Sequence, residues 1–203
     1  MDCEMELEDI IERCQKMKID CIAITDHGTV EGALKMQEIA PFKVIAGEEV
    51  LTDKGEILGM FLKETIPSNI SVDEAISRIK EQGGLVCLPH PFDPLRGLTI
   101  DLVEVDKLAP SIDIIEVFNA RSPINSTADK ALEYAIRHEI PMTAGSDSHT
   151  LGEIGRTFVE IDDFNTPDQL IEVLKHGRIS QHKASIFVHF FSTITKIKRK
   201  LRK

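Results

Sequence analysis

The stretch PMTAGSDSHT, residues 141 to 150, predicts a buried strand that ends in two metal-binding side chains. PMTAG is a short, mainly apolar run, and Asp147 and His149 follow it one residue apart. Carboxylate and imidazole groups are common ligands of zinc, manganese and iron. A single pair of this kind is weak evidence, because a His at a strand end is more often a hydrogen-bonded structural group. The rest of the chain therefore decides between the two interpretations.

Short apolar runs and longer amphipathic segments alternate along the whole chain. The runs predict strands at 21–25, 43–51, 56–62, 85–89, 113–118, 141–145 and 157–161, and the amphipathic segments predict helices at 5–17, 30–39, 71–82, 100–108, 127–138 and 166–176. Ser71 and Glu74 have the spacing of a capping box, and Pro167 follows Thr166 at a first helical position. This alternation predicts an α/β fold of parallel strands joined by helical crossovers, as an open doubly wound sheet or a closed barrel.

Ligand-type residues lie at or near the ends of five of these predicted strands. They are Asp26 and His27, Glu48 and Glu49, His90, Glu116 with Asn119 and Arg121, and Asp147 with His149. The carboxyl ends of parallel strands share one face of an α/β fold, so these groups are expected to converge on one pocket. Imidazoles and ionised carboxylates suit Zn, Mn or Fe ions, and one carboxylate can bridge two ions. The pattern therefore predicts a metal centre.

Composition limits the class of protein. A chain of 203 residues with 42% hydrophobic and 29% charged residues predicts one sizeable globular domain. The chain has no apolar run near 18 residues and begins with an acidic segment, so we expect a cytoplasmic protein. The four cysteines form no CxxC pair and are expected to be reduced. Residues 1–182 carry 17 basic and 34 acidic residues, which argues against a broad nucleic-acid-binding face.

Five short motifs contain most of the ligand-type residues. They are TDHG (25–28), AGEEV (46–50), PHP (89–91), EVFNAR (116–121) and GSDSH (145–149). In this order and spacing they resemble the PHP family, which is named for polymerase and histidinol phosphatase domains. TDHG and GSDSH are specific, whereas PHP and G-x-E alone are weak signals. The resemblance implies a distorted (β/α)7 TIM-like barrel over residues 1–182.

The same resemblance implies two or three divalent metal ions (Zn, Mn or Fe) at the carboxyl face of the barrel. Matched position by position, the metal ligands are Asp2, His27, Glu49, His90, Asp147 and His149, with Glu49 as the bridge. Glu48 is expected to point to the opposite face of its strand, since side chains alternate. Asn119 lies where some family members have a further metal-binding His.

One feature of the family is missing from the sequence. Family members begin with a strand that ends in His-x-His, and this chain starts where the residues after that motif are expected. A barrel without its first strand would expose two strand edges. Two explanations remain open: an omitted N-terminal segment of about ten or more residues, the length that a barrel strand requires, or a natural variant with a depleted metal site.

The resemblance implies a metal-dependent phosphoesterase that acts on a small phosphorylated metabolite or nucleotide. A metal-activated water would attack phosphorus, with His90, Asp147 and His149 as catalytic residues. Arg96, Asn119 and Arg121 are candidates to bind the substrate, although each arginine could equally be a surface residue. An amidohydrolase-type C–N hydrolase and a non-catalytic protein that binds phosphorylated ligands are the two alternatives.

Residues 183–203 form a separate basic tail with seven Lys or Arg and no acidic residue. Its apolar residues and clustered cations fit an amphipathic helix that binds an anionic membrane or nucleic acid. A terminal helix that packs Phe187, Phe190 and Phe191 on the barrel explains the pattern equally well. The sequence does not indicate the oligomeric state.

Overall fold

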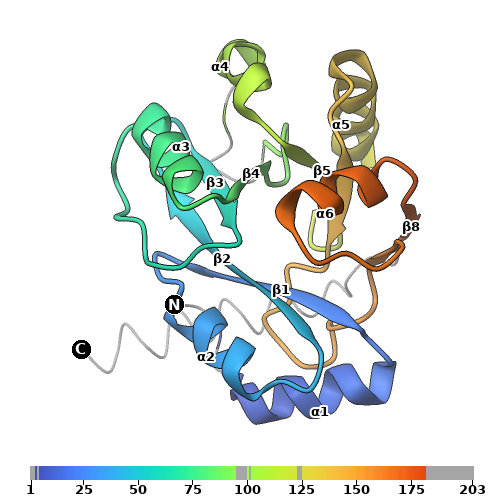
Figure 1. Ribbon diagram of the computed structural model, residues 1–203. Helices are drawn as coiled ribbons and strands as arrows, with labels where there is room; N and C mark the ends of the chain where they lie inside the picture. The colour runs from blue at the N-terminus through green and yellow to red at the C-terminus, as the bar shows by residue number, and fades with distance from the viewer. Residues whose placement is uncertain (1–2, 4, 95–99, 101, 123–124, 182–203) are drawn as a thin grey trace, which may run out of the picture.

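A curved six-stranded sheet with helices on its outer side forms most of the molecule (Figure 1). The computed structural model describes residues 3, 5–94, 100, 102–122 and 125–181. The predictions for Asp2, for Arg96 and for the basic tail at 183–203 lie outside the described residues. The elements are α1 (Leu7–Met17), β1 (Cys21–His27), α2 (Glu31–Ile39), β2 (Lys43–Leu51), β3 (Glu56–Met60), α3 (Val72–Glu81), β4 (Leu85–Leu88), α4 (Leu102–Leu108), a 3-10 turn η1 (Ala109–Ser111), β5 (Ile114–Asn119), α5 (Asn125–His138), β6 (Met142–Gly145), β7 (Phe158–Glu160), α6 (Pro167–Leu174) and β8 (Arg178–Ser180).

The predicted helices and strands are confirmed to within a few residues at their ends. Both predicted helix starts are made by side-chain caps: Ser71 accepts a hydrogen bond from the backbone N–H of Glu74, and Thr166 accepts one from that of Gln169. Strand β8 and the 3-10 turn were not predicted. Of the described helices, none has the length and apolar character needed to cross a membrane.

Strand β3 runs antiparallel to both of its neighbours, so the prediction of an all-parallel sheet is wrong at this strand. The sheet order is β1-β2-β3-β4-β5-β6, and the pairs β1–β2, β4–β5 and β5–β6 are parallel. Only residues 52–55 connect β2 to β3, whereas a parallel crossover needs about a dozen residues. The hydroxyl of Thr52 accepts hydrogen bonds from the backbone N–H groups of Lys54 and Gly55, which closes a tight hairpin.

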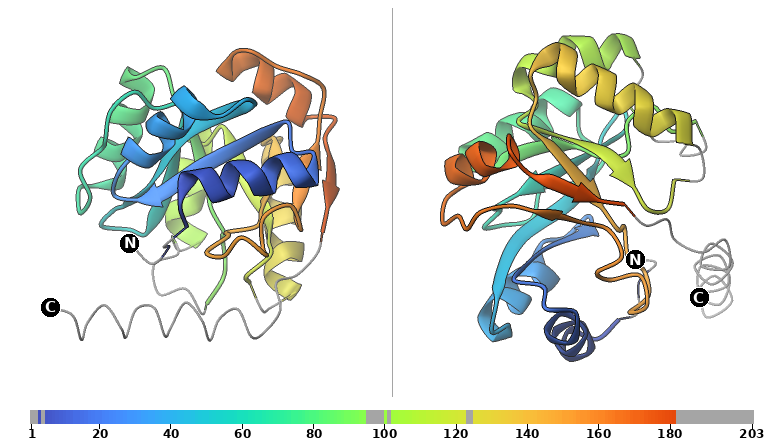
Figure 2. Two further views of the ribbon diagram at one scale, coloured as in Figure 1. Left: turned by 90° about the horizontal axis from the view of Figure 1, so that it is seen from below. Right: turned by 90° about the vertical axis from the view of Figure 1, so that its right-hand side faces the viewer.

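The sheet is a curled half-barrel, and a closed seven-unit barrel is not confirmed. Strands β1 and β6 lie at the two ends of the six-stranded sheet. The predicted strand at 157–161 does not join this sheet, because β7 pairs antiparallel with β8 in a separate two-stranded sheet. Figure 2 shows α1 and α5 at opposite ends of the curved sheet.

Apolar side chains cover both faces of the sheet, in agreement with the alternation along its strands. The outer face packs against helices α2 to α5, with Ala46, Val50, Ile57, Val86 and Ile115 in one large buried cluster. The inner face packs against α6 and the segment before it, through Ile45, Met60, Leu85, Cys87, Ile114, Phe164, Leu170 and Leu174. Figure 1 shows α6 in front of the sheet, with the other helices around its outside. Polar residues that follow the inner-face positions toward the strand ends are therefore left to line a cavity.

Candidate metal centre

His27 and Glu49 are brought together by the parallel pairing of β1 with β2. The two residues are direct register partners, so their side chains project from the same face of the sheet. His27 Nδ1 lies 3.1 Å from Glu49 Oε2. The His27 side chain is 43% exposed and that of Glu49 is 11% exposed, so an ion held between them would reach solvent on one side.

Glu56 is a further member of this group that the sequence analysis missed. It is the first residue of β3 and pairs with Leu51, which lies two residues from Glu49 and therefore on the same face. Its carboxylate lies 4.0 Å from His27 Nδ1 and 3.7 Å from His90 Nε2. The four-residue turn between β2 and β3 could have revealed it. A turn this short predicts a hairpin, in which Glu56 and Glu49 are diagonal neighbours on one face.

His90, which follows β4, completes a first group of ligand-type side chains with His27, Glu49 and Glu56. Its Nε2 lies 3.2 Å from Glu49 Oε1, and the residue is 5% exposed. Its φ angle is 28°, near the left-handed region that non-glycine residues seldom adopt. The backbone N–H of His90 donates a 2.7 Å hydrogen bond to Glu116 Oε2, which holds the residue in this conformation. Such backbone conformations persist where the surroundings enforce them, and they cluster at functional sites.

Glu116 connects the ends of three strands. Besides the N–H of His90, its Oε2 accepts a 3.1 Å hydrogen bond from Asn119 Nδ2, and the same amide lies 3.4 Å from Asp147 Oδ2. A register shift between Glu116 and Phe118 puts Glu116 and Asn119 on the same side of β5 although they are three residues apart. Burial raises the pKa of Glu116, and the neighbouring His90 and Asn119 partly oppose this shift. Glu116 therefore supports the groups around it.

Asp147 and His149 follow β6 and form a second group. Asp147 has a left-handed φ of 48°. His149 Nδ1 lies 2.9 Å from the main-chain oxygen of Asp147 and 3.5 Å from its Oδ1. A hydrogen bond from Nδ1–H to a carbonyl oxygen leaves Nε2 as the metal-binding nitrogen, an arrangement common among histidine ligands.

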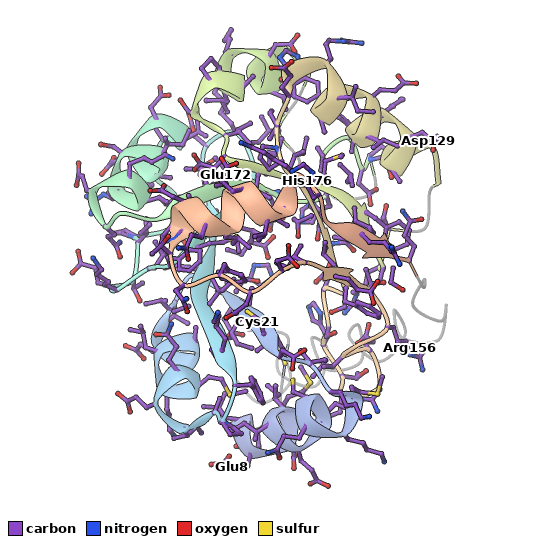
Figure 3. All side chains as sticks on the ribbon, turned by 45° about the vertical axis from the view of Figure 1, so that its right-hand side comes forward. Glu8, Cys21, Asp129, Arg156, Glu172 and His176 are labelled. Atoms are coloured by element: carbon purple, nitrogen blue, oxygen red, sulfur yellow. The ribbon has the colours of Figure 1, made fainter. Side chains whose placement is uncertain are left out.

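Members of both groups line one cavity of about 1300 Å³ on the inner side of the sheet. Its polar lining includes His27, Glu49, His90, Glu116, Asn119, Asp147 and His149. Its apolar wall includes Cys21 and Cys87. Burial raises the pKa of the Cys21 thiol to about 11, and burial also raises the pKa of the Cys87 thiol. In Figure 3, Cys21 lies toward the middle of the molecule while Glu8 and Asp129 lie at the periphery. Cys14, Cys21 and Cys87 are free thiols.

Arg121 is placed differently from the other predicted site residues. It is buried behind the end of β5, with Nη1 3.9 Å from Glu153 Oε1, and it is not among the residues that line the cavity. Its backbone N–H donates to Asn119 Oδ1. This position favours a role in holding neighbouring side chains over direct contact with a phosphate.

The first group is chemically suited to a divalent metal ion. His27, Glu49 and Glu56 each offer one ligand atom, and these atoms all lie within 4.8 Å of one another. Two carboxylates flanked by two imidazoles form a mixed oxygen and nitrogen donor set of the kind that Zn, Mn and Fe ions accept. Two anionic groups held this close also repel each other, and a bound cation would relieve that repulsion.

Glu48, adjacent to Glu49 but on the other face of β2, yields a prediction on pH and stability. Glu48 is fully buried, its Oε2 accepts a hydrogen bond from the N–H of Ile66, and its Oε1 has no hydrogen-bond partner among the described residues. Burial raises the pKa of Glu48 from 4.5 to about 6. The folded protein therefore binds this proton more tightly than the unfolded chain does, and stability falls as pH rises between these two values.

We expect Glu48→Gln to remove this fall in stability with rising pH, because the amide does not ionise. Above pH 6 the variant should be more stable than wild type by about 2 kcal/mol, whereas below pH 4.5 the two should be alike. Urea unfolding of both proteins from pH 4 to pH 8, with a chelator present, measures the difference. Equal free energies of unfolding across the whole range would contradict the prediction.

Comparisons with known proteins show sequence similarity to one family model and to an archaeal protein. The family model described as PHP-associated matches residues 125–179. An uncharacterized protein of Methanocaldococcus jannaschii is 35% identical over 174 residues, which cover 83% of this chain and 70% of that protein.

Two solved structures share the fold at low sequence identity. A two-domain protein from Bacteroides vulgatus that contains a predicted PHP-like metal-dependent phosphoesterase matches with a TM-score of 0.71 and 16% identity over 89% of this chain. The chain spans 61% of the length of that protein. An amidohydrolase from Chromobacterium violaceum, with bound sulfate and no metal, matches with a TM-score of 0.58 and 15% identity, over 81% of this chain and 90% of that one.

Proposed function

Because this chain belongs to the PHP domain family, we propose that it is a metal-dependent phosphoesterase that hydrolyses a small phosphorylated metabolite or nucleotide. One observation carries the proposal: the side chains of His27, Glu49, Glu56 and His90 come from four separate positions in the chain and meet, and three of them line a cavity. Carboxylates and imidazoles gathered in this way are the usual ligands of a hydrolytic metal centre.

Glu49 is the proposed bridge between two ions. Its two oxygens face different imidazoles, Oε2 facing His27 and Oε1 facing His90. A bridging carboxylate needs this division of its oxygens. Asp147 and His149 would hold a further ion, beside Asn119.

Bound divalent ions supply a water molecule of lowered pKa and neutralise charge on the phosphate. The protein's own contribution is to fix the ligands. Glu116 holds His90 by its backbone N–H, and the main-chain oxygen of Asp147 fixes the ring of His149. Asn119, which lines the cavity beside Asp147, is proposed to contact the substrate.

Alanine substitutions at Asp147 and His149 test the proposal. We expect each to lower the hydrolysis of phosphomonoesters by at least about 100-fold and to reduce the bound metal measured by elemental analysis. Asp129→Ala and His176→Ala remove the same side chains from exposed sites and should change neither quantity. Full phosphatase activity in Asp147→Ala and His149→Ala would overturn the mechanism.

An amidohydrolase-type activity is the second candidate, and the similarity to the amidohydrolase of Chromobacterium violaceum favours it. The same metal ligands can activate water for attack on a carbonyl carbon. Parallel assays of the metal-loaded protein with phosphomonoesters and with N-acyl amino acids separate the two activities. Binding of a phosphate ester without turnover of any substrate would support a non-catalytic protein instead.

The identity of the metal and the role of the basic tail are each open to a direct test. We propose Zn, Mn or Fe as the bound ion, which elemental analysis of the purified protein identifies. Contact of residues 183–203 with an anionic membrane or nucleic acid is tested by truncation after residue 182. Loss of binding to anionic vesicles or nucleic acid with an unchanged unfolding midpoint would support this contact, and a lowered midpoint would support packing of the tail on the domain.

A further inference from the structure

Glu153 organises the loop that carries Asp147 and His149. It lies in the turn after β6 and is 2% exposed. Its Oε2 accepts three hydrogen bonds, from the backbone N–H of His149 at 3.0 Å, from the backbone N–H of Thr150 at 2.8 Å and from the Thr150 hydroxyl at 2.9 Å. One carboxylate oxygen therefore determines where the main chain of His149 lies.

The second oxygen of Glu153 faces Arg121. The two side chains are almost fully buried, and Oε1 lies 3.9 Å from Arg121 Nη1. The Arg121 main chain is itself bonded to the side chain of Asn119 at the end of β5. Glu153 thus links the loop after β6 to the residues that follow β5.

The neighbouring residue anchors the same loop from the other side. Ile154 is buried in an apolar cluster with Ile10 and Cys14 of α1, and its carbonyl oxygen accepts hydrogen bonds from the Arg13 guanidinium. These contacts hold the base of the loop. They do not reach His149, whose main-chain N–H is bonded to Glu153.

We propose that Glu153 is a positioning residue of the metal centre, which sets His149 so that its Nε2 binds an ion. The proposal rests on the proposed function, since it assumes that Asp147 and His149 are metal ligands. Glu153 lies outside the five motifs that contain the proposed ligands. Loss of the carboxylate is expected to displace His149 and to leave the first group of ligands in place.

Metal titration of the chelator-treated protein tests the proposal, with Zn²⁺ or Mn²⁺ as the probe and a chromogenic chelator as competitor. In Glu153→Gln we expect the ion held by Asp147 and His149 to bind about 10- to 100-fold more weakly, the usual effect of removing a partner of a ligand. The ion held by His27, Glu49, Glu56 and His90 should bind within about 3-fold of wild type. Glu160→Gln, which changes an exposed carboxylate of β7, should match wild type at both sites.

The outcomes separate this proposal from the proposed function. If wild-type protein binds neither probe ion, the proposed function fails. If wild type binds ions at two sites and Glu153→Gln binds them equally well, the positioning role is overturned. Glu153→Asp keeps the charge opposite Arg121 but shortens the side chain, and it should also weaken the second site alone. If both variants weaken the two sites equally, or lower the unfolding midpoint of the metal-free protein until it no longer folds, the carboxylate serves folding and the proposal is overturned.

Discussion

Replacement of Glu49 by Gln is expected to lower metal affinity and phosphate-ester hydrolysis by at least about 100-fold, more than the loss of any partner of a ligand. Both oxygens of Glu49 face imidazole nitrogens, at 3.1 and 3.2 Å, so the neutral amide removes the charge from the middle of the first ligand group. The amide also has one oxygen where a bridge between two ions needs two. Metal titration and a phosphomonoester assay measure the two losses.

The adjacent residue provides a matched control. Glu48→Gln makes the same chemical change one residue away, on the opposite face of the same strand, and should retain metal affinity and activity. Circular dichroism of both variants verifies that the fold is retained. Wild-type metal affinity in Glu49→Gln, or an equal loss in the two variants, would contradict the assignment of Glu49 as the bridge.

Gly145→Ala is expected to destabilise the protein by about 1–3 kcal/mol and to weaken metal binding. A Cβ atom at this position would lie 2.0 Å from Glu116 Oε1, far inside any contact distance. Glu116 cannot retreat while it keeps its hydrogen bonds to the N–H of His90 and to Asn119. Relief of the clash therefore disturbs the support of His90, and the free energy of urea unfolding and the metal affinity should fall together.

Gly152 offers the control for this substitution. It lies in the loop that follows Gly145 and has open space around the position of an added Cβ atom. Gly152→Ala should leave the free energy of unfolding within about 0.5 kcal/mol of wild type, as for other surface changes. Equal stability of Gly145→Ala and Gly152→Ala would show that Glu116 is free to move, and its supporting role would be wrong.

Local sequence patterns were sufficient to predict most of the fold. The strands were predictable because buried strands leave continuous apolar runs, and helices α3 and α6 began where Ser71 and Thr166 signalled a cap. The ligand-type residues were predictable as a group, because parallel strands present their carboxyl ends on one face. His27, Glu49 and His90 are in contact as this argument requires.

The missed features have two causes: one local turn was misinterpreted, and the other contacts join residues that are distant in the chain. The reversal of β3 followed from a four-residue turn, and the parallel interpretation of the sheet concealed both this reversal and Glu56. Strand β7 has an ordinary strand sequence, but its partner is β8 and not the large sheet. The residues next to Glu153 in the sequence do not distinguish it from a surface glutamate. Its supporting role becomes visible only in the fold, which brings Arg121, 32 positions earlier in the chain, beside it.

The hairpin of β2 and β3 also affects the order in which the centre assembles. His27, Glu49 and Glu56 lie within about thirty residues of one another in the chain, so short loops suffice to gather them. Asp147 and His149 join across some ninety further residues, a closure that carries a larger entropic cost and is slower. An ion supplied during refolding would therefore first meet an incomplete set of ligands. The remaining ligands would become available only when the C-terminal half of the chain packs against the sheet.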